Sequence, residues 1–395
     1  MKFIHSGDWH IGKIVNEYSM LENQKKFFDD LVEIIKREEV DALVIAGDVY
    51  DRSIPPTGAV ELLDRYVDKI INELNVPILA ISGNHDGGER LAYGSSIMKK
   101  SGYHMAGILK ENIEKVTIKD TDFYLIPYFD PALARKVFGD DSIKSHEDGM
   151  KKVIDIINED RDKSRKAVVV AHGYVTSVNF DKDKSRKEII KEIGVVESDS
   201  ERPLTIGGTE FISGKIFEGF DYVALGHLHE PKRVSKDDET IRYSGSPLKY
   251  SVSEKDHKNS ISIVELGENG LSVKVEEIIP LKNIRVLKGS LEELLSKEFY
   301  SNQKVDDYIH FILTDDGELY EPMAKLKAVY KNPLSLERSY KRTLNDENIE
   351  VKVRDMDKSK SELFKDFYEN VTKMELSDER LNIVKEIIEE VEGEK

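Results

Sequence analysis

Short segments rich in aspartate, asparagine and histidine recur along this chain at spacings that suit metal binding. There are five: Asp8-Trp9-His10, Gly47-Asp48, Gly83-Asn84-His85-Asp86, His172-Gly173 and Gly226-His227-Leu228-His229. In extended backbone, residues two apart point to the same side, so the first and last segments can each direct two side chains at one ion. Oxygen and imidazole ligands without sulfur suit manganese, iron, zinc or nickel rather than calcium. Two such ions about 4 Å apart could bind a phosphate and generate a hydroxide.

Each of these segments directly follows an apolar run that is typical of a buried strand. We expect these strands at residues 2–5, 42–46, 76–81, 166–171 and 221–225. The first three runs, which alternate with helices, predict a parallel sheet with right-handed crossovers. Sites in open α/β sheets lie at the carboxyl ends of the strands, so the polar turns after these three strands should meet along one edge. The strand before Asp48 should lie centrally, which makes Asp48 the expected bridging carboxylate.

The pattern of apolar residues elsewhere in the sequence predicts the helices and strands that pack around this sheet. Amphipathic helices are expected at residues 24–38, 57–74, 91–100 and 147–159, because apolar residues recur there at helical spacing. Residues 241–247 and 260–265 are expected to form strands of a second sheet layer. The predicted fold class is therefore α/β: a two-layered β-sheet sandwich flanked by helices, followed by a small α/β capping domain and a C-terminal helical pair.

Composition and charge limit the function classes. The chain has 395 residues, no cysteine and a net charge of −17. Without cysteine it has no disulfide, no thiol nucleophile and no cysteine-bound zinc, which fits a reducing cytoplasm. The negative charge argues against binding nucleic acid through bulk basicity, although metal ions and local basic patches leave a nuclease open. No apolar run approaches the ~20 residues of a membrane span, so no membrane partner is expected.

The motifs resemble those of the calcineurin-like binuclear metallophosphoesterases and, more narrowly, of the SbcD nuclease subunits of bacterial SbcCD DNA-repair complexes. The narrower resemblance covers about residues 1–265 and rests on GDVYDRSIPP at 47–56, ESDSERPL at 197–204, GHLHEP at 226–231 and RYSGSPL at 242–248. It implies a cytoplasmic, Mn-dependent DNA nuclease that acts in repair, recombination and replication. Such an enzyme is an exonuclease on duplex ends and an endonuclease on single-stranded or hairpin DNA. It works with the ATPase SbcC.

The resemblance also implies a role for each site residue. Asp8, His10, Asp48 and His229 would hold one Mn²⁺, and Asp48, Asn84, His172 and His227 would hold the other. His85 would not be a ligand: it would contact the scissile phosphate and assist departure of the 3′ oxygen, with Asp86 holding its imidazole. Asp51 stands where archaeal and eukaryotic relatives carry a histidine, so a role for that histidine has no counterpart here. Trp9 is expected to pack beside the site, with stacking on a base as the alternative.

Three parts are expected: a nuclease domain at 1–280, a capping, DNA-guiding domain at 281–355 and a helical partner-binding segment at 356–395. A basic cluster in the second part could contact phosphates or be a solvated surface: Lys325, Lys327, Lys331, Arg338, Lys341 and Arg342. The resemblance suggests that the C-terminal helices bind the coiled-coil base of SbcC. Packing on their own domain or a homodimer contact are the alternatives. It also implies a homodimer through the helices near 57–74 and 91–100.

Two other functions remain open. A phosphomonoesterase or cyclic-nucleotide phosphodiesterase could use the same metal ligands, but the capping part and the helical tail argue against it. A non-catalytic, metal-stabilised scaffold could deliver DNA to another enzyme. The position of His85 argues against that function, because a scaffold has no need of an imidazole that faces the phosphate.

Overall fold

The parallel strands predicted to carry the first polar segments lie side by side in one sheet of the computed structural model. The structure describes residues 1–177, 198–201, 210–339, 359–372 and 376–393. The sheet has the order β16-β15-β1-β4-β5-β6. Its strands are β1 (Lys2–Ser6), β4 (Ala42–Ala46), β5 (Ile78–Ile81), β6 (Tyr103–Ala106), β15 (Ser260–Gly267) and β16 (Gly270–Glu277). Strands β1, β4 and β5 run parallel and β4 is internal, both as predicted, and β6 is a further parallel strand beside β5.

A second six-stranded sheet packs against the first. Its order is β13-β14-β12-β9-β8-β7, with bounds β7 (Glu114–Ile118), β8 (Thr121–Leu125), β9 (Lys166–His172), β12 (Tyr222–Gly226), β13 (Lys232–Ser235) and β14 (Asp238–Tyr243). Side chains of both sheets interdigitate in one apolar core, which includes Phe3, Val44, Leu79, Phe123, Val170, Tyr222 and Val264. The two-layered α/β fold is therefore confirmed. One assignment is wrong: the strand predicted at 260–265 was expected in the second layer, but it is β15, which pairs with β1 in the first sheet. A strand pattern in the sequence does not identify the neighbouring strand.

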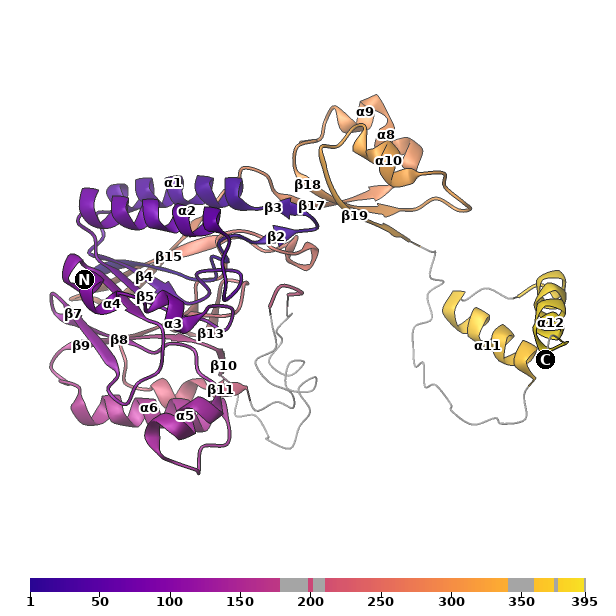
Figure 1. The fold of residues 1–395 in the computed structure, drawn as a ribbon. Coiled ribbons are helices and arrows are strands. Elements are labelled where there is room, and N and C mark those ends of the chain that lie inside the picture. Colours follow the sequence, from indigo (N-terminus) through magenta and orange to yellow (C-terminus); the bar gives the residue numbers. More distant parts are fainter. Residues whose placement is uncertain (178–197, 202–209, 340–358, 373–375, 394–395) are drawn as a thin grey trace. The chain divides into compact units, whose positions relative to one another are not determined.

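Helices cover the outer faces of both sheets (Figure 1). Helices α1 (Leu21–Glu38) and α2 (Thr57–Asp68) lie over the first sheet, and α5 (Pro131–Phe138) and α6 (His146–Asp160) over the second. Helix α2 continues as a π-helical turn at Lys69–Glu73. The continuous helix predicted at 91–100 is wrong. Short helices α3 (Gly88–Leu91) and α4 (Ser95–Met98) flank Gly94, whose φ of 72° ends helical geometry.

Two short strand pairs complete this part of the chain. They are β2 (Ile14–Val15) with β3 (Tyr18–Ser19), and β10 (Tyr174–Thr176) with β11 (Phe211–Ser213). Among the described residues, no helix combines the length and the apolar character that a membrane crossing needs.

The chain divides into two units, Met1–Val286 with Asp306–Ile309, and Leu287–Val305 with His310–Lys395. A three-stranded sheet has the order β17-β18-β19, with bounds β17 (Ile284–Gly289), β18 (Tyr308–Leu313) and β19 (Asn332–Arg338). Helices α8 (Leu291–Leu295), α9 (Lys297–Tyr300) and α10 (Pro322–Lys327) accompany it. In the second unit, Phe311 packs on Tyr330 with ring centroids 5.0 Å apart. Helices α11 (Lys360–Thr372) and α12 (Asp378–Gly393) contact each other, and Leu376 between them is buried.

Candidate metal centre

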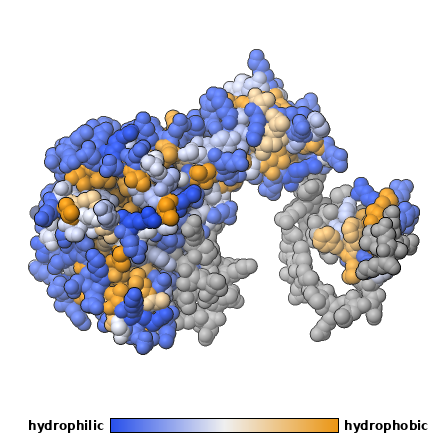
Figure 2. All heavy atoms as spheres, viewed as in Figure 1, coloured by the Kyte–Doolittle hydropathy of each residue, from blue (hydrophilic) through white to orange (hydrophobic). Residues whose placement is uncertain are grey.

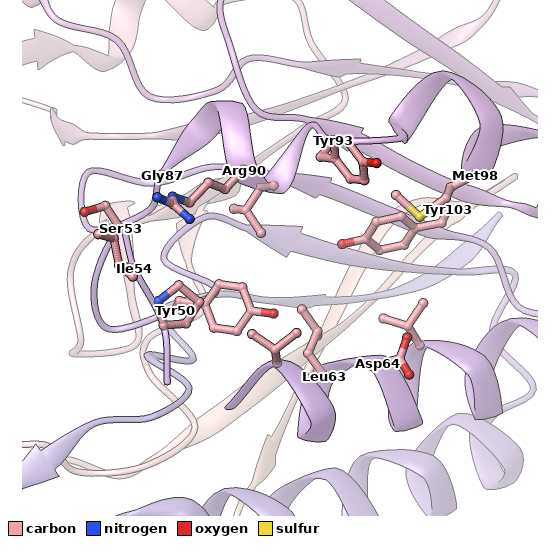
Figure 3. Close-up of a pocket in the computed structure, with 14 residues that line it drawn as sticks. Tyr50, Ser53, Ile54, Leu63, Asp64, Gly87, Arg90, Tyr93, Met98 and Tyr103 are labelled. Carbon is pink, nitrogen blue, oxygen red and sulfur yellow. The ribbon is translucent and has the colours of Figure 1, made fainter. Parts of the chain in front are cut away.

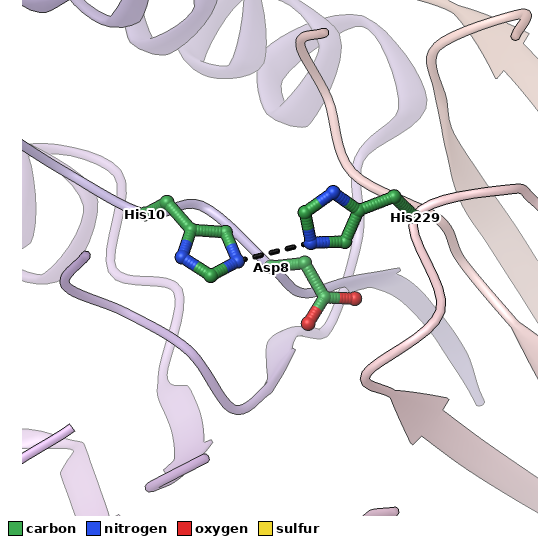
Figure 4. Close-up of side chains that lie close together, drawn as sticks. All are labelled: Asp8, His10 and His229. Atoms are coloured by element: carbon green, nitrogen blue, oxygen red, sulfur yellow. Dashed lines mark hydrogen bonds between the residues drawn. The ribbon is translucent and has the colours of Figure 1, made fainter. Parts of the chain in front are cut away.

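The carboxyl ends of β1, β4, β9 and β12 bring predicted ligands together in two buried groups. Asp8, His10 and His229 form one, and Asp8, Asp48 and His172 form the other; within each group all ligand atoms lie within 4.8 Å of one another. Nε2 of His10 lies 3.0 Å from Nε2 of His229, with the Asp8 carboxylate beside them (Figure 4). All five side chains are at most 3% exposed. The turns after β1 and β4 meet at one edge of the first sheet, as predicted, and the ends of β9 and β12 bring their histidines to the same place from the second sheet.

Asp48 lies between two histidines that belong to different groups, and Asn84 contacts one of them. Oδ2 of Asp48 lies 3.6 Å from Nε2 of His10 and 3.5 Å from Nε2 of His172. Oδ1 of Asn84 lies 2.9 Å from Nε2 of His172. Nδ1 of His172 lies 2.9 Å from the Ala46 carbonyl, which turns Nε2 toward Asp48 and Asn84.

The seventh predicted ligand, His227, lies at the edge of this arrangement. Its ring centroid is 5.4 Å from that of His172, and its backbone N–H donates to Oδ1 of Asp8 at 3.0 Å. A third group of ligand atoms among the described residues consists of His10, Asp51 and His85, and His227, in contrast to the other predicted histidine ligands, belongs to none of the three. The structure therefore brings its ring beside the centre rather than into any of these groups.

Several residues of the centre have left-handed backbone conformations. The φ angles are 51° at Asp8, 44° at His10, 48° at Asp48 and 113° at His227. Such conformations cost on the order of 1 kcal/mol or more each for non-glycine residues and gather at functional sites. Backbone hydrogen bonds compensate, from Asp8 to the Gly47 carbonyl at 3.0 Å and from His10 to the Asp48 carbonyl at 2.9 Å.

The donor set fits divalent cations. Burial raises the pKa of Asp8 well above its usual value, and burial lowers the pKa of His10 well below its own, because each charged form is deprived of water. Cations would offset the buried negative charge and would bind the neutral imidazole. The Nε2 atoms of His10 and His229 lie 3.0 Å apart, so both could bind the same ion.

Glycine is required where two of the turns meet. A Cβ on Gly83 would lie 2.2 Å from Oδ1 of Asp48 and 2.4 Å from its backbone nitrogen. This close approach lets the turn after β5 reach the turn after β4, and Oδ1 of Asp48 accepts from the backbone N–H of His85 at 2.9 Å.

His85 packs against the centre through His10. Their ring centroids are 4.6 Å apart at an interplanar angle of 83°. Nδ1 of His85 lies 3.0 Å from the carbonyl of Asp51, so a proton on Nδ1 leaves Nε2 as the unprotonated nitrogen of the neutral ring. The Asp51 carboxylate lies 2.8 Å from Nζ of Lys13.

The Asp86 carboxylate contacts backbone groups of two turns. Its carboxylate accepts hydrogen bonds from the backbone N–H groups of Val49 at 3.0 Å, Tyr50 at 2.9 Å and Gly83 at 2.9 Å. The contact at Nδ1 of His85 that the resemblance implies for Asp86 is made by the Asp51 carbonyl. Burial, with the nearby Asp48 charge, raises the pKa of Asp86 to about 7. Asp86 therefore fixes the two turns from which Asp48 and His85 project.

The partners of His229 were missed at the sequence level. Its Nδ1 lies 2.8 Å from Oε1 of Glu254 and 2.9 Å from Oγ of Ser200, and its backbone N–H donates to Glu201 at 2.7 Å. Burial lowers the pKa of His229, but the carboxylates of Glu254, Glu201 and Asp8 together raise it to about 9. Ser200 and Glu201 lie in the ESDSERPL motif, which could have indicated them. Glu254 stands in no recognisable pattern.

Two further residues lie outside the ligand set. His5 is a buried structural histidine, with Nδ1 3.0 Å from the Tyr222 hydroxyl. Trp9 is 2% exposed and packs edge-on against Phe28 at 5.0 Å. Its indole N–H donates to Ser6, so the ring belongs to the core rather than to a surface that could stack on a base.

Comparisons with known proteins identify the family of the chain. A calcineurin-like phosphoesterase family model matches residues 1–231, and a model described as the type 5 capsule protein repressor C-terminal domain matches residues 280–372. The SbcD subunit of the SbcCD nuclease of Staphylococcus saprophyticus is 34% identical over 375 residues, which are 94% of this chain and 93% of that protein. Among solved structures, a dimetal phosphatase from Danio rerio aligns with a TM-score of 0.39 at 12% identity, over 71% of this chain and 96% of that one. The chain is a metal-dependent phosphodiester hydrolase that belongs to the calcineurin-like phosphoesterase family and, within it, to the SbcD family.

Proposed function

We propose that the chain is a Mn²⁺-dependent DNA nuclease of the cytoplasm that acts with the ATPase SbcC in DNA repair and recombination. It would digest duplex ends as an exonuclease and cut single-stranded or hairpin DNA as an endonuclease. The observation that carries the proposal is the buried convergence of Asp8, His10, Asp48, His172 and His229, with His85 packed against it. The similarity to an SbcCD nuclease subunit along nearly the whole chain supports DNA as the substrate.

In this proposal Asp8, His10, Asp48 and His229 hold one ion, and Asp48, Asn84, His172 and His227 hold the other. The near-equal distances from Asp48 to Nε2 of His10 and of His172, 3.6 and 3.5 Å, support a bridging role for its carboxylate. The bound ions would polarise the phosphate and lower the pKa of the attacking water. His85, held at Nδ1 by the Asp51 carbonyl, would take a second proton on Nε2 and, as the imidazolium, would donate that proton to the 3′ oxygen as this oxygen leaves.

We propose the same three functional parts that the sequence predicts, at 1–280, 281–355 and 356–395. In the second part, Lys325, Lys327 and Lys331 would guide DNA phosphates, and Arg338 would support the loop that carries Asp315, whose carbonyl its guanidinium contacts at 3.1 Å. Lys341 and Arg342 lie outside the described residues.

The C-terminal helices would bind SbcC. Large apolar side chains of α11 and α12 stay exposed although the helices pack on each other: Leu363 is 50% exposed, Phe364 40%, Phe367 63%, Ile383 55% and Ile387 53%. Figure 2 shows orange, hydrophobic surface on the C-terminal helices. An apolar helical face of this kind suits a coiled-coil partner.

A second copy of the chain would pack on the surface around α2, α3 and α4. Val60, Tyr93 and Ile97 are 44%, 85% and 75% exposed there. They lie at or beside a pocket of about 350 Å³ that Tyr50, Leu63, Leu91 and Met98 also line (Figure 3). Exposed apolar side chains of this size are typical of an interface, and a homodimer would cover them.

The nuclease proposal is tested with the full chain and Mn²⁺ on single-stranded and hairpin DNA, beside His85→Ala and beside a small phosphomonoester. We expect DNA cleavage that His85→Ala loses by about 10²-fold or more while it still binds Mn²⁺. Hydrolysis of the phosphomonoester without DNA cleavage would instead favour a phosphatase. Tight DNA binding without any hydrolysis would favour a scaffold.

A further inference from the structure

Tyr128 stands beside the metal centre on a different ligand from His85. His85 packs on His10, whereas the Tyr128 ring meets His172 edge-on, with centroids 6.3 Å apart at 86°. Asp48 contacts both of these histidines. The two side chains therefore border the centre at separate positions, and only His85 has a role in the proposed reaction.

The backbone and the ring of Tyr128 are held in place. Its backbone N–H donates to the carbonyl of Ser82 at 2.9 Å, directly before the Gly83-Asn84-His85 turn, and Pro127 restricts the preceding backbone. The ring also packs on His146 at 5.9 Å, and His146 is only 3% exposed. A ring that is anchored in this way loses little conformational entropy when it binds a ligand.

The hydroxyl end of Tyr128 is less constrained. The residue is partly exposed, and its hydroxyl makes no hydrogen bond to any other residue in the described part of the chain. A fixed donor with no protein acceptor beside a phosphate-binding centre is suited to a phosphate oxygen of the substrate.

We infer that the Tyr128 hydroxyl binds a phosphate of the nucleotide that neighbours the scissile one, and so positions a polynucleotide rather than a small ester. The inference rests on the proposed nuclease function. The scissile phosphate would lie at the ligand atoms of Asp48 and His172. The Tyr128 ring borders His172 from outside the ligand groups, where only a longer substrate has a further phosphate to offer.

The test compares Tyr128→Phe with wild type in the full chain with Mn²⁺, on a single-stranded oligonucleotide and on bis(p-nitrophenyl) phosphate. We expect KM for the oligonucleotide to rise about tenfold, which corresponds to about 1.4 kcal/mol, while kcat stays within about twofold. Hydrolysis of the small diester should not change. The matched control is Tyr124→Phe, which removes a buried hydroxyl four residues earlier that has no hydrogen-bond partner among the described residues.

Three results would overturn the inference. Unchanged oligonucleotide kinetics in Tyr128→Phe would show that no such contact exists, while the nuclease proposal would stand. An equal loss on both substrates would place Tyr128 in the support of His172 instead, and a Mn²⁺ titration would show weaker binding. A wild-type chain that hydrolyses the small diester but no DNA would overturn the proposed function and this inference with it.

Discussion

Nδ1 of His229 lies 2.8 Å from a carboxylate oxygen of Glu254, and Nε2 of the same ring lies 3.0 Å from Nε2 of His10 (Figure 4). Glu254 therefore orients His229, a predicted ligand, toward His10, which is another. Glu254 is fully buried, and its second oxygen accepts from the backbone N–H of Tyr250 at 2.7 Å. Carboxylates that hold a ligand histidine in this way are part of many metal sites.

Replacing Glu254 with glutamine should weaken Mn²⁺ binding by about 10- to 100-fold, because the amide no longer favours the required orientation and basicity of His229. Titration calorimetry on the full chain measures this affinity. The matched control is Glu265→Gln, on an exposed side chain of β15, which should bind Mn²⁺ like wild type. Equal affinities for the Glu254 variant and wild type would contradict the role.

Metal binding should weaken as the pH falls below about 9. The neighbouring carboxylates, with Glu254 the first of them, raise the pKa of His229 to about 9, so at neutral pH the imidazole must lose a proton before it can bind a metal ion. Protons compete with the ion for the imidazole, so the metal affinity falls by up to about tenfold for each unit by which the pH is lowered, if one proton is released on binding. Calorimetry in buffers of different ionisation enthalpy counts the protons released. Affinity that is flat between pH 7 and about 9 would contradict this account.

Gly83→Ala should disrupt the centre. A Cβ would lie 2.2 Å from Oδ1 of Asp48, so one of the two turns must shift. We expect a loss of stability of about 1–3 kcal/mol and loss of Mn²⁺ binding. Gly267→Ala is the control, because the nearest atom to its Cβ lies at 3.9 Å and its backbone is not left-handed. Thermal melts and Mn²⁺ titrations of both variants decide the matter, and normal Mn²⁺ affinity in Gly83→Ala would refute the argument.

Glu38 should contribute stability that depends on pH. Hydrogen bonds from Lys2 and Lys274 lower its pKa from 4.5 to about 2. A carboxylate whose pKa is lowered on folding stabilises the folded state fully above its unfolded value, and the contribution is lost as the pH falls from about 4.5 toward 2. The Tm difference between wild type and Glu38→Gln should therefore be present at pH 7 and shrink over this range. A constant difference would point to packing instead of charge.

Removing residues 359–395 should abolish capture of this chain by SbcC in a pull-down with both proteins purified. Phe367→Asp should weaken capture strongly, because it places a charge on a side chain that is 63% exposed and apolar. Lys385→Ala, at an exposed polar position of α12, is the control and should leave capture unchanged. Capture that survives the deletion would contradict the proposed partner surface.

The sequence by itself determined the fold class, because each polar segment closes an apolar run and parallel strands place their carboxyl ends at one edge. It also indicated Asp8, His10, Asp48 and His172 as neighbours, since D-x-H and strand-end spacings restrict where side chains can point. The family resemblance extended this prediction to the identity of the centre. These are local patterns, so they can be recognised in a single sequence.

Only the tertiary structure decided which residues support that centre. The Asp51 carbonyl that holds His85 is a backbone group, and any residue type at position 51 would supply one. Glu254 reaches His229 across 25 positions, and the pairing of β15 with β1 joins residues more than 250 apart. Contacts of this kind arise from packing rather than periodicity, so no local spacing in the sequence marks them.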